Sequence, residues 1–338
     1  MSLTIALDAM GGDHGARITV AAALAFSRQQ PDIHLILVGQ EDILRAELDR
    51  HGEDSDHISI HHASQVVAMD EPPALALRKK KDSSMRVAIN MVKENKAQAC
   101  VSAGNTGALM ATAHFVLKGL PDIARPALCS TLPTTSGHVH MLDLGANVEC
   151  SPEQLLQFGV MASIMVTARE NKSQPRVGLL NIGEEDIKGN DVVKKAAVLF
   201  RNSKLNYQGY IEGNEIYTGD MDVVVCDGFV GNVALKASEG VVQMIIHVMK
   251  EEFRRNMFTR LMGLLAMPVL KAFGRRMDHR IYNGASLLGL NGIVIKSHGG
   301  TDALGFQYAI AVAAHEARSR LIERMTKDLS TLLGETAA

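Results

Sequence analysis

The chain has 338 residues, of which 46% are hydrophobic, 21% are charged and only 4% are aromatic, with no tryptophan. This composition is typical of an ordinary soluble globular protein that can bury a substantial core. The net charge of −2 and the scarcity of aromatic rings argue against nucleic-acid binding, which relies on basic surfaces and stacking platforms.

Apolar runs that predict β-strands alternate along the chain with helical patterns. The strands are expected near residues 3–7, 33–38, 58–61, 98–102, 127–132, 138–143, 176–181, 222–226 and 292–296. The helices are expected near residues 16–29, 41–50, 83–95, 106–117, 152–169, 190–201, 231–250, 251–273 and 302–328. Most strand runs are continuously apolar, as strands are when helices cover both faces of a sheet. The pattern predicts one three-layer α/β/α domain over residues 1–338, with a mainly parallel, doubly wound sheet.

Clusters of glycine and polar residues stand where the strand runs stop. They occupy residues 8–15, 102–107, 143–147, 181–190, 227–232 and 297–302. Ligands of open α/β sheets bind beyond the carboxyl ends of the strands, where glycines let backbone N–H groups and helix N-termini approach an anion. We therefore expect the loops to converge on one edge and to form a phosphate-handling site. The expected substrate- or phosphate-binding residues are Asp8, Gly11, Gly12, Asp13, Gly104, Asn105, Thr106, Gly107, Asp143, Asn147, Gly183, Glu184, Glu185, Asp227, Gly228, Gly231 and Gly299.

Each loop also has a plainer interpretation. The 102–107 loop is a suitable anion cradle, whereas 8–13 could equally be a tight turn with an aspartate cap. The dinucleotide pattern G-x-G-x-x-G and the P-loop pattern are both absent, so no nucleotide is specifically indicated. The acids of 183–190 could form a solvated loop, hold magnesium, or tune Lys188 toward a phosphate.

Residues 251–277 do not fit a plain soluble enzyme. The uncharged run between Arg260 and Lys271 is far shorter than the ~20 residues of a membrane-spanning helix. The expected membrane contacts, flanked by basic residues, are Leu261, Leu264 and Leu265. This pattern suits a protruding amphipathic helical hairpin on anionic lipid, and a dimer-interface helix pair fits it equally well.

Cysteine spacing and the N-terminus bear on the cellular compartment. The four cysteines are Cys100, Cys129, Cys150 and Cys226, and none forms a C-x-x-C pair, so we expect reduced small hydrophobic side chains and no zinc or disulfide framework. The first residues enter a strand without a leader pattern, which predicts a cytoplasmic protein.

Four motifs, at residues 5–13, 102–108, 181–185 and 226–232, resemble those of the bacterial phosphate acyltransferase family, over essentially the whole chain. That family makes acyl-phosphate from fatty acyl-acyl-carrier protein and inorganic phosphate for phospholipid (phosphatidic acid) synthesis. The resemblance implies an isocitrate/isopropylmalate-dehydrogenase-like fold, a homodimer, no metal and no organic cofactor. It also implies peripheral membrane association, with the product passing to a membrane glycerol-3-phosphate acyltransferase.

The residues suit this chemistry, because phosphate is itself the nucleophile and no G-x-S-x-G elbow occurs. We expect Lys188 and Asn232 to contact phosphate and the carbonyl, and His298 to relay a proton to the leaving thiolate. Three alternatives remain: a short-chain phosphate acetyltransferase that uses coenzyme A, an NAD-dependent hydroxy-acid dehydrogenase of the same fold, and a peripheral membrane scaffold without activity.

Overall fold

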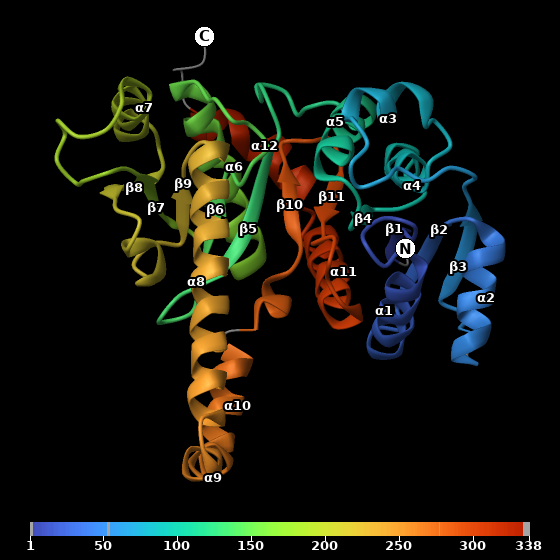
Figure 1. The fold of residues 1–338 in the computed structure, drawn as a ribbon. Coiled ribbons are helices and arrows are strands. Elements are labelled where there is room, and N and C mark those ends of the chain that lie inside the picture. The colour runs from blue at the N-terminus through green and yellow to red at the C-terminus, as the bar shows by residue number, and fades with distance from the viewer. Residues whose placement is uncertain (1–2, 53–54, 277, 334–338) are drawn as a thin grey trace.

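The computed structural model describes residues 3–52, 55–276 and 278–333 (Figure 1). Within these ranges a single 11-stranded sheet has the order β3-β2-β1-β4-β11-β10-β5-β6-β9-β7-β8. Its strands are β1 (Leu3–Asp8), β2 (Ile33–Gly39), β3 (Ile58–His62), β4 (Ala99–Ser102), β5 (Ala127–Pro133), β6 (His138–Leu142), β7 (Arg176–Leu180), β8 (Asn206–Ile211), β9 (Val223–Val225), β10 (Ala285–Leu288) and β11 (Ile293–Lys296).

Helices cover both faces of this sheet. They are α1 (Ala16–Gln29), α2 (Glu41–His51), α3 (Pro73–Lys79), α4 (Ser84–Lys93), α5 (Thr106–Leu117), α6 (Pro152–Glu170), α7 (Asp191–Asn202), α8 (Gly228–Arg254), α9 (Met257–Leu265), α10 (Met267–Arg276), α11 (Ala303–Arg318) and α12 (Leu321–Leu333), with short 3-10 turns at Glu215–Tyr217 and His279–Tyr282. Neighbouring side chains of β1 enter different cores: Ala6 packs in the core under α4 and α5, whereas Ile5 and Leu7 pack in the core under α1 and α11. This alternation confirms the three-layer α/β/α architecture.

The sheet is mainly parallel, but its direction reverses in the middle. Strand β10 pairs antiparallel with both β11 and β5, and β5 pairs antiparallel with β6. The parallel strands on either side therefore run in opposite directions, and the expectation that all six loops share one carboxyl edge is wrong.

The predicted strands are all present, and the differences concern short or polar segments. Strands β8 and β10 and helix α3 were not predicted, since β8 carries Gly209 and polar side chains and β10 has only four residues. The single helix expected at 302–328 is two helices, α11 and α12, which are separated where Arg320 adopts a positive φ of 53°. Helix α8 begins at Gly228 rather than near 231, because the Asp227 side chain caps it through the Val230 N–H.

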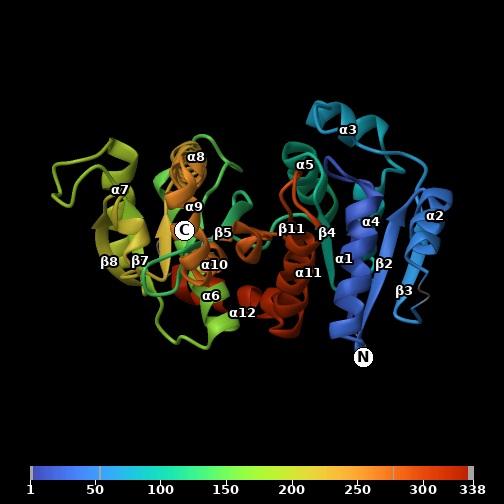
Figure 2. The ribbon, with the colours of Figure 1, turned by 60° about the horizontal axis from the view of Figure 1, so that its bottom comes forward.

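Helices α8, α9 and α10 form an arm that projects from the body of the molecule (Figure 1), and Figure 2 turns this arm toward the viewer. Only Gly228 and Gly231 of α8 are buried, whereas Gly263 of α9 packs against Phe253. Among the described residues, α8 has the length and apolar composition that could cross a membrane. The segment expected at 251–277 falls on the end of α8 and on α9 and α10, and residue 277 lies outside the described residues.

Candidate active site

The loops that follow β1 and β4 meet at a buried carboxylate. Asp8, the last residue of β1, is 1% exposed, and its Oδ2 accepts a hydrogen bond of 2.6 Å from Ser102 Oγ at the end of β4. Ser102 Oγ in turn accepts the Gly104 N–H at 3.0 Å. The other carboxylate oxygen, Asp8 Oδ1, is buried without a hydrogen-bond partner in the protein. A buried acceptor left without a partner is costly, so it marks a place where a substrate proton could bind.

The glycines of these loops allow three backbone segments to approach closely. A side chain at Gly11 would lie 2.5 Å from Asp8 Oδ2 and 2.8 Å from the Gly104 nitrogen. Gly12 has a φ of +87°, and a Cβ there would lie 3.0 Å from the Gly299 carbonyl oxygen. The Asp13 N–H donates to that same carbonyl at 2.9 Å, which ties the loop after β1 to the loop after β11. The structure thus brings together the predicted residues of three loops.

The same place contains a cation that the sequence analysis did not select. Lys296, the last residue of β11, is 8% exposed, and its ammonium donates to the carbonyl oxygens of Ala103, at 3.4 Å, and Ser297. The sequence signal was a lysine that directly continues the apolar run Ile293–Ile295 into a glycine-rich loop. Burial of a charge costs free energy of folding, so a buried lysine is more often functional than an exposed one.

Burial dominates the electrostatics of this lysine. It lowers the pKa of Lys296 to about 8, although the nearby charges of Asp8 and Asp13 raise it. The positive charge of Lys236, on α8, lowers it further. Burial also raises the pKa of Asp8, against the opposing effect of its hydrogen bond from Ser102. Both shifts move the pKa toward neutral pH, which favours proton transfer there.

Two other predicted residues of these loops have structural roles in addition. Asn105 caps α5 by accepting the Ala108 N–H at 2.9 Å, and its amide donates to the Met69 and Glu71 carbonyls. His298 is exposed, and its Nδ1 accepts the Gly300 N–H at 3.2 Å, which leaves Nε2 to carry the proton of the neutral ring. Thr106 and Gly107 form the first turn of α5, whose positive dipole end favours an anion.

The loops after β6 and β9 form a second cluster with an evident structural function. Both oxygens of the buried Asp143 accept hydrogen bonds, from the Leu128, Ala146 and Asn147 N–H groups and from the Asn147 amide. The Gly228 N–H donates to the Asn147 carbonyl at 2.8 Å. Cβ atoms at Gly228 and Gly231 would collide with this cluster, Gly231 at 2.0 Å from the Asp143 carbonyl oxygen. These contacts fix the start of α8. Asn232, in the first turns of α8, is exposed and lies beside Gly145 at the surface of this cluster.

The loop after β7 is separate from both clusters. Its Lys188 side chain is 46% exposed and lies 3.9 Å from the 64% exposed carboxylate of Glu185. Glu184 is exposed as well, whereas Gly183 is buried. In Figures 1 and 2 this loop leads into α7 at the β7–β8 end of the sheet, away from α5 and β11.

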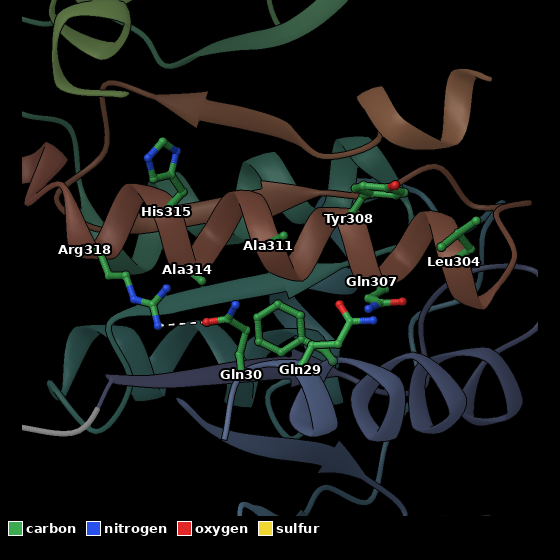
Figure 3. Close-up of a pocket in the computed structure, with 10 residues that line it drawn as sticks. Gln29, Gln30, Leu304, Gln307, Tyr308, Ala311, Ala314, His315 and Arg318 are labelled. Atoms are coloured by element: carbon green, nitrogen blue, oxygen red, sulfur yellow. Dashed lines mark hydrogen bonds between the residues drawn. The ribbon is translucent and has the colours of Figure 1, made fainter. Parts of the chain in front are cut away.

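The larger cavity and the candidate metal-binding group of the described residues lie outside these loops. A cavity of about 320 Å³ lies between α1 and α11 and contains none of the predicted residues (Figure 3). A pocket of about 10 Å³ lies at the loops themselves, lined by Gly11, Ala103 and Gly299 among others. Among the described residues, three side chains lie close enough to share a metal ion, namely His138, His140 and Glu170, and they belong to neither cluster.

Comparison with known proteins gives consistent matches over the whole length. The family model described as "Fatty acid synthesis protein" matches residues 3–324. A phosphate acyltransferase of Alkalilimnicola ehrlichii is 59% identical over 98% of this chain and 97% of its own length, and that of Nitrosococcus oceani is 57% identical over 99% of each. Among solved structures, a phosphotransacetylase from Streptococcus pyogenes has a TM-score of 0.63 and the EutD phosphotransacetylase from Staphylococcus aureus one of 0.60. Both cover 94% of each chain at 17% and 16% identity, so they show the fold alone.

Proposed function

Since the chain belongs to the fatty acid synthesis protein family and its close relatives are phosphate acyltransferases, we propose that it transfers a fatty acyl group from acyl-acyl-carrier protein to inorganic phosphate. A phosphate oxygen attacks the thioester carbonyl, a C–O bond forms and the C–S bond breaks. The proton of hydrogen phosphate ends on the leaving sulfur. The products are acyl-phosphate and the carrier thiol. The names of the relatives do not favour the coenzyme A or dehydrogenase alternatives.

The observation that carries this proposal is the buried pair of Lys296 and Asp8 among glycine-rich loops. The Lys296 ammonium offsets the charge of a phosphate dianion, in a place where little water competes for it. The P–OH group of hydrogen phosphate is a donor that fits the partnerless Asp8 Oδ1. A carboxylate whose pKa is raised by burial is a better acceptor for this proton, so Asp8 acts as general base when the phosphate attacks.

The remaining residues complete the proposed site. Backbone N–H groups of Gly11, Gly12 and residues 105–107 supply donors for the phosphate oxygens, whereas those of Asp13 and Gly104 already donate within the protein. His298 lies in the loop that follows Lys296 and relays to the sulfur the proton that Asp8 takes from hydrogen phosphate, one ring nitrogen receiving a proton as the other gives one up. Asn232 and Lys188 remain candidates for contacts to the phosphate and to the carbonyl of the thioester. The exposure of Lys188 supports a role only after substrate has bound.

Exposed apolar side chains on the arm support a homodimer and peripheral attachment to the cytoplasmic face of the membrane. Val241, Met244, Ile245 and Val248 are 47–59% exposed and follow a helical i, i+3, i+4, i+7 spacing on α8, as in a helix pair between two subunits. At the end of the arm the exposed leucines are Leu261, Leu264 and Leu265. We propose one α/β/α domain in which α8 joins two subunits and the tip of the arm enters anionic lipid. An acyl-phosphate made there reaches a membrane glycerol-3-phosphate acyltransferase without crossing water.

The direct experiment incubates the protein with palmitoyl-acyl-carrier protein and phosphate and detects acyl-phosphate by mass spectrometry. We expect product only when phosphate is present. Equal thioester cleavage without phosphate would identify a hydrolase instead. A parallel reaction with acetyl-coenzyme A tests the short-chain alternative, which predicts faster turnover of that donor.

A further inference from the structure

Two histidines and a glutamate meet at the start of β6, at the end of this strand opposite to Asp143. His138 and His140 are two residues apart on one strand, so their side chains leave the same face of the sheet. Glu170 is the last residue of α6. His138 Nε2 and His140 Nε2 lie 2.7 Å and 2.6 Å from the same oxygen, Glu170 Oε1. One ligand atom from each residue thus lies within 4.8 Å of the others.

The surroundings hold these side chains in place for a ligand. His140 is 2% exposed, and its second nitrogen, Nδ1, lies 3.2 Å from Thr131 Oγ1 on the neighbouring strand β5. The other oxygen of Glu170, Oε2, lies 3.0 Å from Lys172 Nζ, which is also 3.0 Å from Asp222 Oδ1. Outer contacts of this kind orient the imidazole and carboxylate ligands of metal sites.

We propose that His138, His140 and Glu170 bind one Zn²⁺ ion through the two Nε2 atoms and Glu170 Oε1, with water as the fourth ligand. Imidazole nitrogens favour zinc over magnesium or calcium, and two histidines with one glutamate form a known zinc donor set. Metal–ligand bonds of about 2.0–2.1 Å in a tetrahedral site require ligand atoms about 3.3 Å apart. The ion therefore replaces the two hydrogen bonds of 2.7 and 2.6 Å and moves each Nε2 away from Glu170 Oε1 by roughly 0.6 Å.

The protons balance without an additional reactant. Each neutral imidazole that binds through Nε2 carries its proton on Nδ1, and His140 Nδ1 then donates to Thr131 Oγ1. Glu170 keeps Lys172 as a partner for Oε2. The ion would connect the end of α6 to the β5–β6 hairpin, so we expect it to stabilise this part of the fold and to leave the chemistry at Lys296 unaltered.

The test is equilibrium dialysis of the full chain against Zn²⁺, followed by metal analysis and thermal unfolding. We expect one tightly bound zinc per chain and a higher unfolding temperature with zinc. His138→Ala should abolish both effects, and His138→Gln, which retains a donor to Glu170, should abolish them while keeping the zinc-free fold. Thr131→Val, which removes a positioning contact, should weaken binding about 10–100-fold.

His247→Ala is the matched control, because His247 is an exposed histidine that also lies near a glutamate, 3.5 Å from Glu251, and is outside the group of described residues that could share a metal ion. It should bind zinc like the unaltered chain. The unaltered chain loaded with Co²⁺ instead of Zn²⁺ should show the visible absorption of a tetrahedral site. No binding at micromolar Zn²⁺, or one equivalent bound equally by both His138 variants, would overturn the proposal. Acyl-phosphate formation should be the same in all these variants, so a failure here leaves the proposed activity separately testable.

Discussion

Replacing Lys296 by methionine removes a buried charge while keeping an unbranched apolar side chain of similar length. Lys296 is 8% exposed, and its ammonium donates to two carbonyl oxygens. If it stabilises charge on the phosphate or on the tetrahedral intermediate, its loss should lower turnover about 10²–10³-fold, the usual effect of removing one such donor. Turnover of the unaltered enzyme should also fall as the pH rises through about 8, where this lysine loses its proton.

The same substitution should also change how the free energy of unfolding depends on pH. Burial lowers the pKa of Lys296 from 10.5 to about 8, a difference of about 2.5 units, or roughly 3.4 kcal/mol at 1.36 kcal/mol per unit. Between these pH values the unfolded chain binds this proton and the folded chain does not. The free energy of unfolding attributable to this lysine therefore rises with pH from about 8 to 10.5 and is lower at neutral pH.

Urea unfolding at several pH values measures this contribution as the difference between the unaltered chain and Lys296→Met. The difference should change by roughly 3 kcal/mol in favour of the unaltered chain as pH rises across that interval. Lys93→Met, at an exposed position near the end of α4, is the control and should alter neither turnover nor this pH dependence. Unchanged turnover of Lys296→Met would refute the catalytic assignment, and a pH-independent difference would refute the buried-charge argument.

Three further substitutions test the remaining assignments. Asp8→Asn should lower turnover about 10²-fold or more, since an amide cannot accept the phosphate proton as a base does; a normal circular dichroism spectrum would separate this loss from unfolding. Lys188→Ala should lower turnover about 10²-fold if the lysine meets charge in the transition state, and unchanged phosphate-dependent turnover would assign it to a solvated loop. Changing Leu261 and Leu264 together to Glu should release the protein from anionic vesicles with soluble turnover largely intact, because each inserted leucine contributes roughly 1.5–3 kcal/mol. Salt should weaken the vesicle binding of the unaltered chain. Size-exclusion chromatography beside vesicle co-sedimentation distinguishes membrane binding by the tip from a role in the dimer interface. A role in the dimer interface predicts a monomeric or insoluble double mutant. A double mutant that stays dimeric and still pellets with vesicles would exclude the tip as the anchor.

Much of the local structure was determined by the sequence alone. Continuous apolar runs predicted most strands that are buried on both faces, because burial on two faces favours apolar side chains throughout the run. The central strand β10 was missed because it has only four residues and one of them is the polar Ser286. Side chains such as Asp227 and Asn190 cap the helices that follow their loops, through short-range bonds to N–H groups three residues on. The glycine clusters at strand ends were also local signals, and their association with strand ends was confirmed.

Only the tertiary structure decided which of those loops meet. The reversal of direction at β10 and β5 separates the loops after β6, β7 and β9 from those after β1, β4 and β11, and strand direction leaves no mark in an apolar run. For this reason Asp143, which satisfies backbone N–H groups, and Asp8, which keeps one oxygen without a partner, looked alike in the sequence. Lys296 and the group of His138, His140 and Glu170 likewise gain their chemistry from burial and from partners distant in the chain. Desolvation shifts the pKa of Lys296, and neither burial nor long-range contact is encoded within a local window of residues.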